Sequence, residues 1–385
     1  MIGFETIGNA TITVFDEKPV LVTDPWIEGN PYFGSWAHKY QIPAQQLENI
    51  KNAKYVWVSH GHPDHIDPDS LNIFKDKTFL IASHYGDRIY NDLKKNYKVI
   101  KLKNNSWFEL SKNIRVKTFA DWNQDSCLLI EINKDQIILN LNDGQALGWS
   151  TTIKNIIKDY KHKFLLALVS WGDADMINFY NNNHFIQPHA ALQKPCGETY
   201  SYLMKKWGCN YAIPFSSMHK YMREDSIKMN KFITPLDRHY DKFDNKTGEL
   251  LPAFINWNSI QKDFSEIKPL ENTQLPVSEK IYNDFWTDDL NKDDKLVIEN
   301  YFNSFHVYSI EWDLSTIKWY VDDVLIQNVV RTSSTVLDDN WPFDKEFHLI
   351  LNTAVGGTLG GPPNLADQSH FMLVDYVRVY QKISN

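Results

Sequence analysis

Apolar runs of strand length alternate with polar turns and amphipathic stretches over roughly the first 300 residues. This alternation is typical of an α/β protein. Buried strands are expected at residues 20–23, 55–58, 78–82 and 164–169. Helices are expected at residues 85–97, 152–160, 198–207 and 225–231. The apolar runs 127–132 and 136–141, separated by a polar Asn-Lys-Asp turn, predict a β-hairpin.

The pattern changes near residue 303, where alternating apolar and polar positions predict an all-β segment up to residue 381. Strands are expected at residues 305–312, 317–321, 347–357 and 372–380, with a turn at Asp322 and Asp323. Two domains are therefore predicted, residues 1–300 and 303–381.

Composition narrows the classes of function. The net charge of −8 gives no basic surface for nucleic acid, so no nucleic-acid partner is expected. The three cysteines have no metal or redox spacing, which favours free thiols in a reducing compartment. The first residues show neither the basic nor the apolar region typical of a leader peptide, and no apolar run approaches about 20 residues. We therefore expect a cytoplasmic protein with no transmembrane segment.

The sequence Val-Ser-His-Gly-His-Pro-Asp-His begins at Val58, where the strand 55–58 ends. It contains His60, His62, Asp64 and His65 in the spacing H-x-H-x-D-H. Imidazole and carboxylate are ligands for zinc, iron and manganese. A tight loop can direct the first two histidines to one point and the next two residues to a neighbouring point.

This motif and its flanks resemble the metallo-β-lactamase-fold hydrolases. The further matching segments are residues 7–14 (an opening strand), 23–26, 139–143 and 214–219. The resemblance implies a four-layer αββα fold for residues 1 to about 300, followed by a C-terminal extension resembling part of a jelly roll. Residues 219–226 and 234–237 place it near the branch that contains ascorbate-phosphate lactonases, N-acyl phosphatidylethanolamine phospholipase D and CMP-N-acetylneuraminate hydroxylase. That hydroxylase also needs a Rieske centre, and its paired Cys-x-His elements are absent here.

The resemblance also implies a site with one or two divalent ions, zinc first, with iron or manganese as alternatives. His60, His62, His65 and His219 would hold metal. Asp143 would bridge the ions or complete their shell. Asp64 would bind metal and, with His65, form the catalytic pair that orients the nucleophile. Asp24 would support the metal-binding loop from behind.

One expected ligand is missing, because the family normally has a further His after the strand that residues 114–119 resemble. Asp121 or Asp125 can replace it, since carboxylate oxygen binds the same metals. The alternative is a weak or empty first metal position.

Three residues are candidates for contact with substrate. His184 and His189 lie in the Asn-, Asp- and aromatic-rich segment 171–189, which predicts a long functional loop or a plain surface loop. Arg223 can bind an anionic group or pair with Asp225 or Asp237. Five other histidines are interpreted as structural or exposed: His38, His84, His162, His239 and His370.

Residues 303–381 resemble the C-terminal part of laminarinase-type family 16 glycoside hydrolases, through the strings W-Y-V-D, L-N-x-A-V-G-G and D-Y-V-R-V-Y. The paired carboxylates of those enzymes, E-x-D-x-x-E, are absent from the chain. The segment can serve packing or dimerisation, or it can bind carbohydrate through Trp319, Trp341 and Asn352.

The predicted function is metal-dependent hydrolysis of an ester, lactone or phosphodiester bond in a small or sugar-related molecule. One alternative is a carbohydrate-binding protein that acts through its C-terminal segment, and another is a mononuclear iron protein that handles oxygen. A homo-oligomer formed through the C-terminal segment is also considered.

Overall fold

The computed structural model describes residues 1–32, 34–121, 125–169, 180–181, 184–185, 195–216, 218–278, 281, 306–331 and 377–379. Contacts within the chain divide it into two units, Met1–Asp284 and Phe285–Asn385. The boundary predicted near residue 300 lies outside the described residues.

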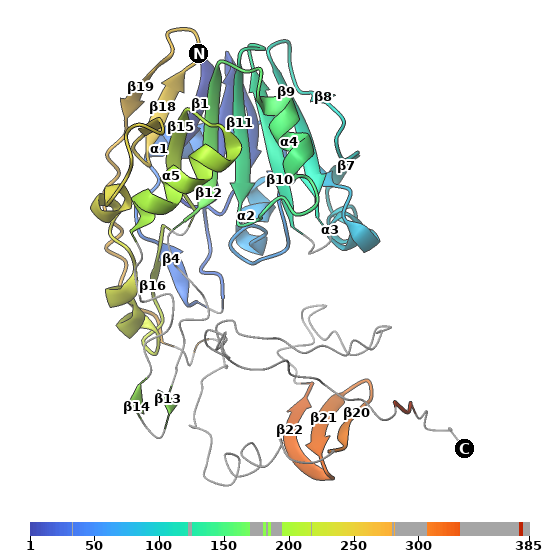
Figure 1. The fold of residues 1–385 in the computed structure, drawn as a ribbon. Coiled ribbons are helices and arrows are strands. Elements are labelled where there is room, and N and C mark those ends of the chain that lie inside the picture. The colour runs from blue at the N-terminus through green and yellow to red at the C-terminus, as the bar shows by residue number, and fades with distance from the viewer. Residues whose placement is uncertain are drawn as a thin grey trace, which may run out of the picture. The chain divides into compact units, whose positions relative to one another are not determined.

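The first unit is built on two mixed sheets (Figure 1). The first sheet has the order β19-β18-β1-β2-β3-β5-β6-β7. Its strands are β1 (Ile2–Thr6), β2 (Ile12–Asp16), β3 (Lys18–Thr23), β5 (Tyr55–Val58), β6 (Thr78–Ala82), β7 (Lys98–Leu102), β18 (Ile255–Asn258) and β19 (Asp263–Glu266). The second has the order β17-β15-β12-β11-β10-β9-β8. Its strands are β8 (Phe108–Glu109), β9 (Ile114–Ala120), β10 (Ser126–Ile132), β11 (Gln136–Asn142), β12 (His162–Leu168), β15 (Tyr211–Phe215) and β17 (Glu249–Leu250).

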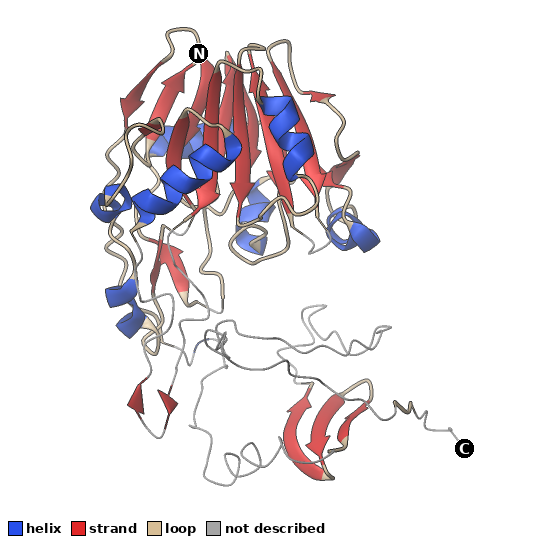
Figure 2. Ribbon diagram, viewed as in Figure 1, coloured by secondary structure: helices blue, strands red, loops and turns tan. Residues whose placement is uncertain are grey.

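Aromatic and aliphatic side chains of both sheets meet between them and form the main core. Phe4 of β1 meets Phe164 of β12 edge to face, with ring centroids 5.2 Å apart, and Trp257 of β18 packs on the same ring at 4.8 Å. Helices cover the two outer faces (Figure 2). They are α1 (Ala44–Asn52), α2 (Pro68–Ile73) and α3 (Arg88–Leu93) on the first sheet, and α4 (Ser150–Ile157) and α5 (Cys196–Trp207) on the second. The predicted four-layer αββα arrangement is confirmed.

Three local predictions were wrong at their boundaries. Residues 7–11 form the connection between β1 and β2, because Gly8 and Asn9 have φ values of +77° and +46° and break the extended chain. The helix predicted at 85–97 is a 3-10 turn (Tyr85–Asp87) followed by α3, because Gly86 and Asp87 are also left-handed. The segment predicted as a helix at 225–231 forms a 3-10 helix at Ile227–Phe232. A second 3-10 helix follows at Leu236–Tyr240.

The predicted hairpin is present as β10 and β11, with Ile132 opposite Gln136. A separate two-stranded sheet pairs β4 (Trp36–His38) with β16 (His219–Tyr221). Within the predicted loop 171–189, the described residues form β13 (Tyr180–Asn181) and β14 (His184–Phe185), which pair antiparallel. The rest of that loop lies outside the described residues.

Parallel pairing of β3, β5 and β6 brings the carboxyl ends of these strands to one edge of the first sheet. Asp24 follows β3, and Ser59 and His60 follow β5. Asp143 follows β11 of the opposing sheet. In open α/β sheets, ligands bind at this edge, so the fold brings the predicted metal ligands to the same region.

The described part of the second unit is a three-stranded antiparallel sheet of β20 (Tyr308–Trp312), β21 (Thr316–Val321) and β22 (Val324–Val330). The predicted turn at Asp322 and Asp323 joins β21 to β22, with φ values of +48° and +66°. The strand expected at 347–357 lies outside the described residues. Of the strand expected at 372–380, only residues 377–379 are described, and they form no regular structure.

All three cysteines are free thiols with buried side chains. Within the described residues, no helix combines the length and apolar character that membrane crossing requires.

Glu5 of β1 generates a prediction about stability. Its side chain accepts a 3.0 Å hydrogen bond from Asn49, but burial raises the pKa of Glu5 to about 7, above the ordinary 4.5. The folded state therefore retains a proton that the unfolded state loses, and this contribution to stability is lost as the pH rises from about 4.5 through about 7. Glu5→Gln should leave stability nearly unchanged at pH 4.5 and increase it by about 2–3 kcal/mol at pH 8.

Urea unfolding at both pH values measures this difference. Glu48→Gln, at an exposed position of α1, serves as the matched control and should show no pH-dependent gain. An equal effect of Glu5→Gln at both pH values would contradict the prediction.

Candidate metal centre

The H-x-H-x-D-H segment forms a compact turn after β5. The backbone N–H groups of His65 and Ile66 both donate to the carbonyl of His62, over 3.0 and 3.1 Å. Asp67 then caps α2 by accepting hydrogen bonds from the backbone of Asp69 and Ser70. The local sequence therefore fixes the direction in which the motif's side chains leave the loop.

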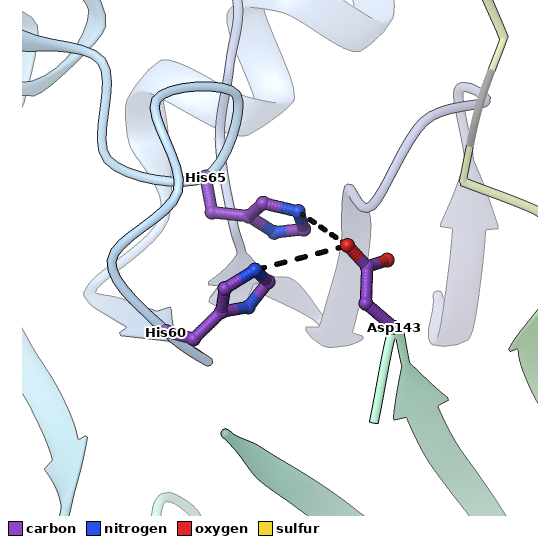
Figure 3. Close-up of side chains that lie close together, drawn as sticks. All are labelled: His60, His65 and Asp143. Atoms are coloured by element: carbon purple, nitrogen blue, oxygen red, sulfur yellow. Dashed lines mark ion pairs between the residues drawn. The ribbon is translucent and has the colours of Figure 1, made fainter. Parts of the chain in front are cut away.

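His60, His65 and Asp143 converge on one point (Figure 3). The Oδ2 atom of Asp143 lies 3.7 Å from His60 Nε2 and 3.4 Å from His65 Nε2. One ligand atom from each of these residues lies within 4.8 Å of the others. The two rings come from the loop after β5, and the carboxylate comes from the end of β11, so both sheets contribute to the cluster.

The other two motif residues extend the cluster in different directions. His62 is exposed, and its Nδ1 lies 2.7 Å from His60 Nε2. Asp64 Oδ2 lies 3.3 Å from His65 Nε2, while its Oδ1 accepts a 2.7 Å hydrogen bond from the hydroxyl of Tyr32. The structure therefore brings all four motif residues to the cluster.

His219 enters from β16 and is fully buried. Among the described residues neither of its ring nitrogens has a hydrogen-bond partner. An unsatisfied buried imidazole is costly, and a metal ion provides the partner that such a nitrogen lacks. The nitrogen and oxygen donors of this site fit zinc, iron or manganese.

Asp24 holds the start of the histidine loop through hydrogen bonds to Ser59 and Asn142. Its Oδ1 accepts hydrogen bonds from the backbone N–H and the hydroxyl of Ser59, over 2.8 and 3.0 Å, and its Oδ2 accepts one from Asn142 over 2.9 Å. Asp24 also lies 3.5 Å from His65 Nδ1. Ser59 Oγ lies 2.9 Å from His60 Nδ1, and its hydrogen is already donated to Asp24. His60 therefore carries its proton on Nδ1, which leaves Nε2 for a metal.

Carboxylates dominate the electrostatics of His65. Burial favours its neutral form, but Asp64, Asp143 and Asp24 outweigh burial and raise the pKa of His65 well above 6.5. Contact with His65 in turn holds the pKa values of Asp64 and Asp143 below their ordinary range, against the effect of burial. The cluster is therefore an anionic environment that stabilises a cation.

The pKa values of the two other buried histidines of the site, His60 and His219, shift in the opposite direction. Burial lowers the pKa of both His60 and His219 to about 3. Both are neutral at physiological pH, which is the form that binds metal. Metal binding at these two rings requires no loss of a proton.

The structure distinguishes the two candidates for the missing ligand. Asp125 Oδ1 lies 3.5 Å from His60 Nδ1, and burial together with Asp143 raises the pKa of Asp125 to about 7. Asp121 is buried and accepts a 3.2 Å hydrogen bond from the backbone of Asp125. Asp125 therefore contacts the histidine cluster directly, while Asp121 contacts Asp125.

Of the three substrate candidates, Arg223 already has a carboxylate partner. Arg223 is buried, and its guanidinium pairs with Asp225 through Nε, at 2.9 Å, and through Nη2. This is one of the two salt bridges that the sequence left open. His184 begins β14, and His189 lies outside the described residues.

Several residues around the cluster were not predicted from the sequence. Ser59, Asn142, Tyr32 and Trp36 all contact candidate ligands, but their contacts depend on segments distant in sequence. His84, interpreted as structural or exposed, is buried two residues after β6, which agrees with the structural interpretation. Only the adjacency of Ser59 and Asn142 to ligand motifs was visible in the sequence.

The four layers, with the histidine loop after β5 and Asp143 after β11, decide the fold. The first unit has the metallo-β-lactamase fold. Igni18, described as a novel metallo hydrolase from Ignicoccus hospitalis, aligns with 69% of this chain and 99% of its own, at 15% identity and a TM-score of 0.42.

Sequence comparison finds two kinds of relatives. The family model for glycosyl hydrolases family 16 matches residues 258–377. A β-glucanase from Rhodothermus marinus is 47% identical over 83 residues, which are 20% of this chain and 29% of the relative. Cytidine monophosphate-N-acetylneuraminic acid hydroxylase from Asterias rubens is 27% identical over 171 residues, 42% of this chain and 23% of the relative. The chain thus spans less than a third of each of these curated relatives.

The glycosyl hydrolase match begins inside the first unit. Asn258 is the last residue of β18 and pairs with Gly3 of β1. The matched stretch therefore includes β19 as well as the three strands of the second unit.

Metal content is the first test of the site. The purified protein is expected to carry about one to two divalent ions per chain. The double substitution His60→Ala with His62→Ala should abolish tight binding, because it removes two neighbouring imidazoles from the set of candidate ligands. Elemental analysis by mass spectrometry measures this. His162→Ala, at the amino end of β12, is the control. Full metal occupancy in the double variant would contradict the assignment of His60 and His62 as metal ligands.

A second test separates the two aspartates. Asp125→Asn should weaken metal binding by about 10- to 100-fold, and Asp121→Asn should weaken it less, because Asp125 contacts His60 directly. Competition with a chromophoric chelator measures both affinities. A metal-bound crystal structure then shows whether Asp125 is a ligand, within about 2.0–2.2 Å of the ion, or an orienting partner of His60. A larger loss in Asp121→Asn would reverse the assignment.

Proposed function

We propose that the first unit is a metal-dependent hydrolase that uses water to cleave an ester, lactone or phosphodiester bond. The convergence of His60, His65 and Asp143 carries this proposal, since their ligand atoms lie within 4.8 Å of one another. Their placement at strand ends, where ligands bind in open α/β sheets, supports it further.

The chain's residues divide the work. His60 and His65 both approach Asp143 Oδ2 and would hold the ion together with that carboxylate. His62, which contacts His60, Asp64, which contacts His65, and His219 are the further candidate donors. When bound, a divalent ion supplies Lewis acidity and lowers the pKa of water to about 7.

Asp64 is held as a carboxylate, because His65 lowers its pKa and Tyr32 donates to its Oδ1. It can therefore accept a hydrogen bond from the attacking water and orient it. The reaction consumes one water and gives an acid and an alcohol.

The second unit is proposed to serve packing, self-association or carbohydrate binding, and no glycosidase step is assigned to it. Glycoside hydrolysis needs two carboxylates that flank the bond, and the E-x-D-x-x-E pattern is absent from the sequence. The likeness to a β-glucanase supports the carbohydrate-binding alternative. Of the residues predicted to bind carbohydrate, Trp319 is the one that the structure describes, and it lies on β21.

An iron protein that handles oxygen is the other candidate, supported by the likeness to the hydroxylase from Asterias rubens. The two candidates differ in metal. Iron in the freshly purified protein, with no hydrolysis of any ester tested, would favour this second candidate.

Hydrolysis is tested with nitrophenyl esters, a panel of lactones and bis-nitrophenyl phosphate. The metal-loaded protein is expected to cleave at least one class. Asp64→Asn and His65→Ala should each lower kcat/KM by at least about 100-fold, and a chelator should abolish the reaction. His239→Gln, another buried histidine, is the matched control and should retain activity. Equal rates in the wild-type protein and in Asp64→Asn would contradict the proposal.

A glucan assay separates the carbohydrate alternative. Metal-loaded protein that binds β-1,3-glucan but hydrolyses none of the esters would favour it. Release of reducing sugar that survives His60→Ala and is lost on truncation at about residue 302 would assign glycosidase chemistry to the second unit.

A further inference from the structure

Two aromatic residues contact the candidate ligands Asp64 and His219: Tyr32, in the connection between β3 and β4, and Trp36, the first residue of β4. The Tyr32 hydroxyl donates to Asp64 Oδ1 over 2.7 Å. The Trp36 ring stacks on the His219 ring, with centroids 3.6 Å apart and planes 10° apart. The two aromatic rings also meet each other, at 4.5 Å. A continuous chain of contacts therefore joins one candidate ligand to the other.

The backbone of this turn is held in an unfavourable conformation. Tyr32 has a φ of +56°, which is rare for a bulky side chain. The turn is closed by hydrogen bonds from the backbone of Ser35 to Tyr32 and from Trp36 to Pro31, over 3.0 and 3.2 Å. Strained residues of this kind persist where the surrounding structure requires them. Here the left-handed backbone of Tyr32 accompanies the hydrogen bond from its phenol to Asp64.

The orientation of His219 needs an explanation of its own. A metal-binding histidine usually donates its second ring N–H to a carboxylate or carbonyl, which fixes the ring. Within the described residues His219 makes no such bond. Trp36 lies opposite Tyr221 in the pairing of β4 with β16, so His219 is its diagonal neighbour across the strands. The His219 ring also meets the Tyr221 ring at 5.3 Å and nearly at right angles, but the Trp36 ring is closer and almost parallel. We therefore take the stacking on Trp36 as the contact that sets the plane of the His219 ring.

We propose that Tyr32 and Trp36 are positioning residues that hold Asp64 and His219 together as a ligand pair for one divalent ion. This inference rests on the proposed metal-dependent function. The hydroxyl fixes Asp64 Oδ1, while Asp64 Oδ2 lies 3.3 Å from His65 Nε2. The indole stacks on an imidazole that has no hydrogen-bond partner among the described residues. Each residue acts through a ligand rather than on the metal.

The test is titration with Zn²⁺ and with Co²⁺ against a chromophoric chelator. His219→Gln first identifies the ion that depends on this pair. Tyr32→Phe keeps the ring and removes only the hydroxyl, and it should weaken that same ion by about 10- to 100-fold. Trp36→Leu should weaken it comparably, while Trp36→Phe, which keeps a stacking ring, should lie between Trp36→Leu and the wild type.

Fluorescence provides an independent signal. Co²⁺ bound at His219 should quench the stacked indole, and the quenched component should disappear in Trp36→Phe. The matched controls are Tyr240→Phe, whose hydroxyl donates to the carbonyl of Leu251, and Trp207→Phe, a buried indole of α5. Both should bind the ion as the wild type does.

Unchanged affinity in Tyr32→Phe and Trp36→Leu, with a loss in His219→Gln, would overturn the positioning role and leave the metal centre standing. Equal losses in the two control variants would also overturn it, because they would report a general loss of stability. Failure of the wild-type protein to bind either metal would overturn the proposed function, and this inference with it.

Discussion

The arrangement of the candidate site depends on one buried carboxylate. Asp24 follows β3, accepts two hydrogen bonds from Ser59 after β5, and accepts a third from Asn142 at the end of β11. It therefore joins the ends of strands from both sheets. Burial raises the pKa of Asp24, although His65 and Ser59 favour its ionised form. A buried carboxylate is tolerable only when its oxygens are satisfied, so the loop that satisfies them has little freedom to move. Asp24 thus fixes where the histidine loop begins.

Around His65, the balance of charge favours a bound cation. Asp64, Asp143 and Asp24 surround His65 and raise its pKa, while His60 and His219 are neutral because they are buried. Stability alone would favour pairing or removing such groups. Their concentration at strand ends, with the ring nitrogens of His219 lacking partners among the described residues, is typical of a functional site. The second sheet contributes Asp143, the loop after β5 of the first sheet contributes His60 and His65, and β16 contributes His219. The site therefore also depends on the packing of the core between the two large sheets.

Patterns of short range predicted the elements well. The β10–β11 hairpin and the strands β5 and β6 were identified because apolar runs flanked by polar turns are local signals. The shortened helix after Tyr85 was missed, because its start is set by left-handed backbone at Gly86 and Asp87. The strand β22 was also missed, although five of its seven residues are Val, Leu or Ile, and it pairs antiparallel with β21.

The sequence by itself determined the kind of site, because six residues of H-x-H-x-D-H place metal-binding groups at a strand end whatever surrounds them. The resemblance to the metallo-β-lactamase fold predicted a supporting role for Asp24 behind the histidine loop. Only the tertiary structure separated Asp125 from Asp121, paired Arg223 with Asp225, and brought Tyr32 and Trp36 to Asp64 and His219. These choices depend on contacts between sheets and between β4 and β16, whose partners lie far apart in the chain. Spacing along a sequence carries the local geometry of one loop, but the distance between two loops is set by how the strands beneath them pack.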